Sequence, residues 1–231
     1  MIERENRSSI WVAVVYGAVL LSGCADGPLH SLYYRKQWQD DEKYGPTLFT
    51  RLEELQNLRR EAARMNEQQQ AQLARRLNLS VAQDPSAVYR AQVVRTLGSL
   101  TTPVAIEGLQ LASQDAESVV RIAACEAWGQ RHGVEALHAL GAIVRSDEDL
   151  DVRIAATREL GNFRNQAAVQ SLGVALDDPD PALQFRAVEA LRSISDEDFG
   201  NSVPAWRQYV RGEPVDRPEP PSFVNRILNF F

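Results

Sequence analysis

Two ten-residue stretches in the middle of the chain are nearly the same sequence. Residues 120–129 read VRIAACEAWG, and residues 152–161 read VRIAATRELG. The surrounding block occurs four times between Asp84 and Leu191, at a spacing of 31 or 32 residues. Four aligned columns show the repetition: Asp84, Asp115, Asp147 and Asp178; Tyr89, Val120, Val152 and Leu183; Arg90, Arg121, Arg153 and Gln184; Leu97, Trp128, Leu160 and Leu191. A fixed period of this size indicates a solenoid, whose units bury their apolar faces against their neighbours.

Inside each block the apolar residues follow a helical period. Val120, Ala124 and Trp128 are four residues apart, so they share one face of a helix. A second helix follows in each unit, and its apolar pairs are again 31 and 32 residues apart: Ile106 and Leu109, Leu137 and Leu140, Val169 and Leu172. The pattern predicts an all-α fold, a right-handed α-solenoid of stacked helical hairpins.

The two quoted blocks resemble HEAT repeats, in particular the short HEAT-like type first associated with phycobilisome lyases. The resemblance covers about Asp84 to Ile194, and the fourth copy departs from it, with Gln184 in place of arginine and Arg192 in place of glycine. A terminal repeat has a neighbour on one side only, which suits such departures. The resemblance implies a right-handed superhelix whose groove binds other proteins.

Two sets of charged residues recur with the repeat. One is an Asp/Arg ladder at the start of each block: Asp84, Arg90, Asp115, Arg121, Asp147, Arg153 and Asp178. The resemblance implies that these residues cross-link adjacent repeats through charged hydrogen bonds, and the alternative is a series of anion-binding arginines. The other set lies on the side of these helices opposite the apolar positions of the Tyr89, Val93 and Leu97 type, the side that faces the concave groove in HEAT stacks. Its members are the candidate protein-binding residues Gln92, Arg95, Glu126, Gln130, Arg158, Arg186 and Glu189. Alternatively, this column is a solvated face whose charges compensate one another.

The N-terminal region predicts export and lipidation. An apolar run from Ile10 to Leu20 is too short to span a bilayer and ends at Leu21-Ser-Gly-Cys24. These four residues resemble a bacterial lipobox, which implies cleavage before Cys24 and acylation of its thiol. The alternative is an ordinary signal peptide with a chance cysteine. Glu3 and Glu5, which offset the basic residues of this region, depart from the usual pattern.

The sequence divides the chain into five parts. They are a lipoprotein signal peptide at 1–23, a lipid-anchored tether at 24–46, an N-terminal helical hairpin at 47–83, the HEAT-like repeats with a capping helix at 84–211, and a proline-rich linker with an amphipathic segment at 212–231. The last part places Phe223, Ile227, Phe230 and Phe231 on one helical stripe. This stripe suits a membrane, a partner's groove or the protein's own solenoid.

The composition favours a binding protein over an enzyme. Its 25 basic and 31 acidic residues give a net charge of −6, which argues against binding to nucleic acid. The three histidines belong to no metal-binding motif, and no nucleophile elbow, P-loop or dinucleotide fingerprint occurs. We therefore expect no catalytic residue, metal, cofactor or small-molecule substrate. The predicted function is that of a scaffold or adaptor lipoprotein of the bacterial cell envelope, bound to a protein partner. The alternatives are a lyase-type accessory protein and a mainly structural envelope component.

Overall fold

The computed structural model describes residues 45–215, and among them it contains helices and no strand. The chain divides into two compact units, Met1–Arg51 and Leu52–Phe231, and the second contains the repeats. The helices in chain order are α3 (Leu48–Glu61), the short 3₁₀ helix η2 (Ala62–Arg64), α4 (Glu67–Gln83), α5 (Ala87–Gly98), α6 (Pro103–Ala112), α7 (Ser118–Arg131), α8 (Gly133–Ser146), α9 (Leu150–Leu160), α10 (Gln166–Leu176), α11 (Pro181–Ile194) and α12 (Val203–Arg211). The all-α fold predicted from the repeat is confirmed.

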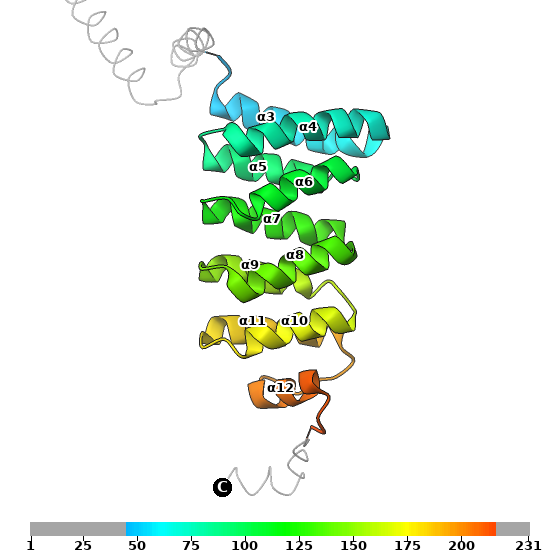
Figure 1. Ribbon diagram of the computed structural model, residues 1–231, viewed down its shortest axis with the longest axis vertical. Helices are drawn as coiled ribbons and strands as arrows, with labels where there is room; N and C mark the ends of the chain where they lie inside the picture. Colours follow the sequence, from blue (N-terminus) through cyan, green and yellow to red (C-terminus); the bar gives the residue numbers. More distant parts are fainter. Residues whose placement is uncertain (1–44, 216–231) are drawn as a thin grey trace, which may run out of the picture. The chain divides into compact units, whose positions relative to one another are not determined.

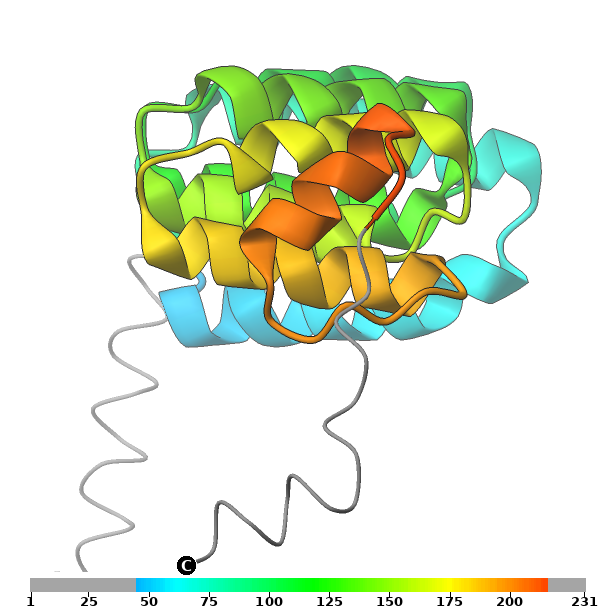
Figure 2. The ribbon, with the colours of Figure 1, turned by 90° about the horizontal axis from the view of Figure 1, so that it is seen from below.

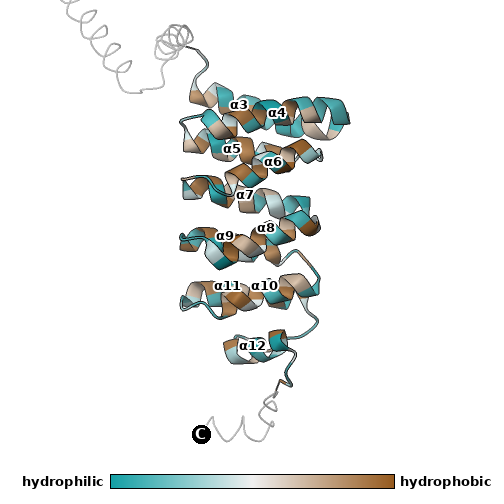
Figure 3. Ribbon diagram, viewed as in Figure 1, coloured by the Kyte–Doolittle hydropathy of each residue, from teal (hydrophilic) through white to brown (hydrophobic). Residues whose placement is uncertain are grey.

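The repeats of the second unit are stacked in two layers of helices (Figures 1 and 2). The first helices of the four repeats, α5, α7, α9 and α11, pack side by side in one layer. In the other layer α4 packs on α6, α8 packs on α10, and α10 packs on α12. Hydrophobic and hydrophilic residues alternate on most of these helices (Figure 3). The apolar side faces the neighbouring helices, which is how a solenoid forms one continuous core.

Side chains cap the helices where the chain turns. Asn66 accepts a hydrogen bond from the Gln69 backbone, and the Gln69 side chain accepts one from the Asn66 backbone, which forms a capping box at the start of α4. Asp149 caps α9 through the backbone nitrogens of Asp151 and Val152. Asp147 and Asp149 therefore act as turn and cap residues.

The repeated glycines bring neighbouring helices close together. They lie at or near the ends of their helices: Gly98 is the last residue of α5, Gly129 lies two residues before the end of α7, and Gly161 directly follows α9. A Cβ atom on Gly98 would lie 2.8 Å from the Ala127 Cβ, and one on Gly161 would lie 3.2 Å from the Ala190 Cβ. The column is therefore glycine because the next helix of the layer leaves no room for a side chain.

Helix α12 closes the C-terminal end of the described stack. Trp206 is fully buried, donates a hydrogen bond to the Gly200 carbonyl at 2.9 Å, and meets the Phe199 ring edge-on at 4.9 Å. This aromatic cluster covers apolar surface that a further repeat would otherwise bury.

Candidate protein-binding face

The Asp/Arg ladder, here called the buried ladder, joins each repeat to the next. Arg90 donates from Nε and Nη2 to the Asp115 carboxylate at 2.8 and 2.7 Å, and from Nη1 to the Asp84 carbonyl at 2.8 Å. Arg121 makes the same three contacts one repeat later, to the Asp147 carboxylate at 2.9 and 3.0 Å and to the Asp115 carbonyl at 2.9 Å. Each arginine thus binds the aspartate of its own repeat through the backbone and that of the next repeat through the carboxylate.

The last two copies of the ladder keep the hydrogen bond to the aspartate carbonyl of their own repeat. Arg153 donates to the Asp147 carbonyl at 3.0 Å and lies 3.5 Å from the Asp178 carboxylate. In the fourth copy Gln184 donates to the Asp178 carbonyl at 2.7 Å. Glutamine therefore keeps the contact inside its repeat and lacks the contact to a following repeat, which explains the departure noted in the sequence.

Burial and pairing perturb the pKa values of this ladder. The hydrogen bond to Asp115 raises the pKa of Arg90, and the hydrogen bond to Asp147 raises that of Arg121. Burial by itself would raise the pKa of Asp115, but the hydrogen bonds from Arg90 and the Glu117 backbone outweigh burial and hold it below its usual value. Arg90 and Arg121 are thus engaged in contacts within the protein.

The column predicted to bind a partner contains a second ladder, here called the surface ladder. Arg95 on α5 donates to Glu126 on α7 at 2.8 Å, and Arg158 on α9 lies 3.7 Å from the same carboxylate. Arg158 also pairs with Glu159 at 2.8 Å. Burial raises the pKa of Glu159, and the hydrogen bond from Arg158 opposes this shift. The charges of this column largely compensate one another along three repeats.

The other predicted members of the column are less strongly paired across repeats. Gln92 accepts a hydrogen bond from Arg95 at 3.5 Å, and Glu189 pairs with Arg192 of its own helix at 2.6 Å. Gln130 is exposed at the end of α7, and Arg186 is half-buried on α11. The structure therefore places all seven predicted residues on the layer formed by α5, α7, α9 and α11.

The same face carries apolar residues that the sequence analysis did not single out. One column aligns Ala91, Ile122, Ile154 and Phe185 at intervals of 31, 32 and 31 residues, and Phe185 is 50% exposed. Val88 and Val119, one turn earlier on their helices, are 58% and 40% exposed. We call Val88, Val119, Ile122, Ile154 and Phe185 the apolar strip. Its periodicity was visible in the sequence, but its exposure was not.

The apolar strip and the surface ladder lie next to each other. Ile122 precedes Glu126 by four residues, as Ile154 precedes Arg158 and Phe185 precedes Glu189. Residues four apart on a helix share a face, so each helix of the layer presents one apolar and one charged position. An apolar strip bordered by charge is the usual composition of a surface that other proteins bind.

Comparison with known proteins agrees with this architecture. Residues 137–205 match a family model described as HEAT repeats. The match supports the assignment of the repeats to the HEAT-repeat family. The match begins within α8 and ends within α12. A search of curated proteins found no match to the chain. HEAT repeats generally mediate interactions between proteins and are generally not catalytic.

Some sequence predictions concern residues outside 45–215. These are the signal peptide, Cys24, most of the tether and the C-terminal segment from residue 216 onward. Within the described range, no group of three His, Cys, Asp or Glu side chains is arranged to hold a metal ion. No helix of that range is long and apolar enough to cross a membrane.

Proposed function

We propose that this HEAT-repeat protein is a non-catalytic scaffold lipoprotein of the bacterial cell envelope, and that it holds a protein partner on the layer formed by α5, α7, α9 and α11. The observation that carries the proposal is the apolar strip beside the surface ladder. Phe185 and Val119 expose apolar surface on a rigid layer whose helices are joined by buried ion pairs.

The partner contacts the apolar strip first and the surface ladder second. Arg95, Glu126 and Arg158 already pair with one another, so a partner gains little from displacing these contacts. The exposed aromatic ring of Phe185 has no such competitor, and aromatic side chains contribute strongly to interfaces. The charges of the surface ladder then set the orientation of the partner and exclude proteins whose charges do not complement them.

Photo-crosslinking tests the face. A photoreactive phenylalanine analogue at Phe185 is compared with the same analogue at Val174, which is exposed on α10 in the other layer. We expect one discrete protein adduct from position 185 in envelope preparations, and none from position 174. Adducts of equal yield from both positions would show that the chosen face is wrong.

Lipidation of Cys24 supplies the proposed attachment to the envelope. The lipobox-like residues Leu21 to Cys24 support it, because acyl chains on one cysteine anchor a protein when more than one chain is attached. Replacement Cys24→Ser should abolish labelling by radioactive fatty acid and leave the N-terminal segment uncleaved. A normally labelled Cys24→Ser protein would end the lipoprotein proposal.

The alternative is a lyase-type accessory role, which rests on the repeat type first associated with phycobilisome lyases. The two proposals differ in whether the partner protein is covalently modified. A scaffold leaves the partner's mass unchanged, whereas a lyase-type protein leaves a covalent addition on it. Intact-mass measurement of the crosslinked or copurified partner therefore distinguishes them.

A further inference from the structure

In the second layer of helices, α6 and α8 lie apart, whereas the neighbouring pairs of helices pack closely on each other. Gly141 of α8 and Gly173 of α10 occupy the same column of the repeat, 32 residues apart. A Cβ on Gly141 would lie 2.8 Å from the Ser171 Oγ of α10, and one on Gly173 would lie 2.6 Å from Val210 Cγ1 of α12. Glycine at this column lets each helix approach the next one closely.

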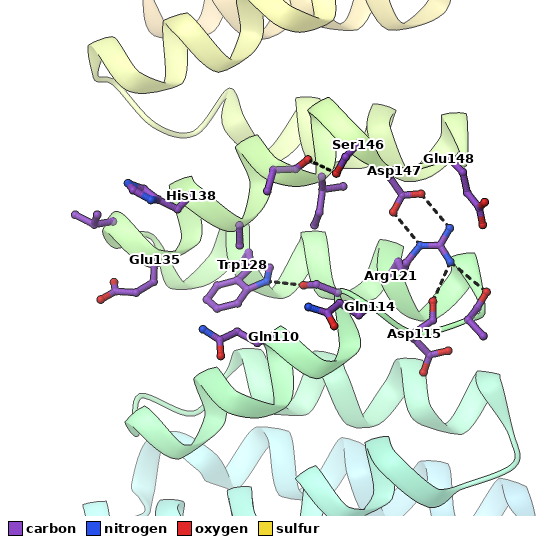
Figure 4. A pocket seen from close by; sticks show the side chains of 16 residues that line it. Gln110, Gln114, Asp115, Arg121, Trp128, Glu135, His138, Ser146, Asp147 and Glu148 are labelled. Atoms are coloured by element: carbon purple, nitrogen blue, oxygen red, sulfur yellow. Dashed lines mark hydrogen bonds and ion pairs between the residues drawn. The ribbon is translucent and has the colours of Figure 1, made fainter.

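In α6 the same column holds Gln110, 31 residues before Gly141. Its side chain, together with Ala139 of α8, lines a cavity of about 960 Å³ between these two helices. The buried Trp128 and Ile143 also line it (Figure 4). Gln110 thus lies at the position where glycine brings the later helices together, and the space between α6 and α8 is a groove lined by apolar as well as polar residues. We call it the α6/α8 groove.

The rim of the groove is acidic. Asp115, Glu135, Asp147 and Glu148 line it, and Arg121 is its one lysine or arginine (Figure 4). Arg121 is held by Asp147, and Asp115 is held by Arg90 of the buried ladder. Glu135 and Glu148 are exposed and form no salt bridge with another described residue. An occupant that is apolar and carries a positive charge fits this groove.

A segment of the chain itself has this composition. Residues 223–231 contain six apolar side chains, and their one charged side chain is Arg226. The apolar side chains would cover the base of the groove, and Arg226 would face the acidic rim. No other stretch of comparable length after α12 combines these features, since residues 212–222 contain four prolines.

The segment is long enough to reach the groove within one chain. α12 packs on α10, where Gln170 donates to the Val210 carbonyl at 3.0 Å, and α10 packs on α8. The groove lies between two and three helix spacings from α12, or roughly 20–25 Å at 8–10 Å per spacing. From Val215 to Phe223 an extended proline-rich chain covers about 25 Å, at about 3.1 Å per residue.

We infer that residues 223–231 bind the α6/α8 groove of their own chain. The inference is independent of the protein-binding face, which lies on the other layer. It identifies the occupant of the groove as an intramolecular segment, which competes with any outside ligand through its high effective concentration.

Disulfide crosslinking in the full chain tests the inference. Ala142→Cys, in the lining of the groove, is combined with Leu228→Cys in the segment. Cys24→Ala leaves Cys125 as the remaining native cysteine, and this residue is buried and its pKa is raised by burial. The matched control replaces Ala142→Cys by Val174→Cys on α10, which lies nearer to α12 along the stack.

We expect the pair at positions 142 and 228 to oxidise roughly tenfold faster than the pair at 174 and 228, to a monomeric product, because binding concentrates the segment at the groove. Arg226→Glu should remove this preference, whereas Arg217→Glu, in the linker, should retain it. Equal rates for the two pairs would overturn the inference and leave the segment to a membrane or a partner. A product that is mainly a disulfide-linked dimer would overturn it in favour of a second copy.

Discussion

The two ladders use the same chemical groups on the same layer of helices, yet they differ in burial. In the buried ladder the side chains of Arg121 and Asp147 are each 8% exposed. In the surface ladder Arg95 and Glu126 are 29% and 27% exposed, and Arg158 is 49% exposed. Both ladders bridge successive repeats at distances near 2.8 Å.

This difference shows that an ion pair's environment decides its role. Arg121 also hydrogen-bonds backbone carbonyls at the turn, so its removal takes these hydrogen bonds and the ion pair with Asp147 from a largely buried site. Arg95 lies where water replaces a lost partner. The buried ladder therefore holds the stack together, and the surface ladder shapes the face that a partner meets.

The largest expected effect comes from breaking the buried ladder. Arg121→Ala should lower the free energy of unfolding by about 3–5 kcal/mol, because it leaves the Asp147 carboxylate buried without its partner. Chemical denaturation followed by circular dichroism measures the change. Arg121→Lys is the matched control: it keeps the charge but loses the bidentate geometry, so it should recover only part of the stability. A fully stable Arg121→Ala protein would contradict the structural role of this ladder.

The next largest effect concerns the charge of Asp115 in the buried ladder, which a change of pH can remove. The pKa of Asp115 is below its usual value in the folded protein, so its ionised form stabilises the fold. This contribution is present above the unfolded pKa and is lost as the pH falls through the folded pKa. Asp115→Asn should therefore destabilise the protein at pH 7 by roughly 1–3 kcal/mol, the cost of losing a charged hydrogen bond.

The difference in stability between the Asp115→Asn protein and the unaltered protein should become smaller below about pH 4. In that range the carboxyl group is protonated first in the unfolded chain and then, at lower pH, in the folded protein. Thermal unfolding at a series of pH values follows this change. A difference in melting temperature that is constant between pH 7 and pH 3 would show that the charge of Asp115 is not the cause.

The smallest effect belongs to the surface ladder. Arg95→Ala should change the free energy of unfolding by less than about 1 kcal/mol, because the pair with Glu126 is partly exposed to water. The difference should become smaller still in 1 M salt, which screens exposed charges. If Arg95→Ala and Arg121→Ala lowered the free energy of unfolding equally, the distinction between the two ladders would be wrong.

The regular parts of the fold were predictable because they depend on local spacing. The period of the columns predicted the helices, the two-helix units and the buried position of Trp128. The resemblance implied that the aspartates and arginines connect repeats, and the bonds of Arg90 and Arg121 do so. The candidate face was predicted in part: its charged column was singled out, whereas the apolar strip that includes Phe185 was not.

What the sequence alone determined about this protein is the repeat, its helical character and its resemblance to HEAT repeats, because these follow from periodicities along the chain. Tertiary structure decided what each irregular residue does. Gln184 and Gln110 both depart from their columns, but the first keeps a backbone contact at the last repeat, and the second lines a groove between α6 and α8. The reason is physical: the effect of a departure depends on the atoms that the neighbouring repeat places against it, and those distances exist only after the helices have packed.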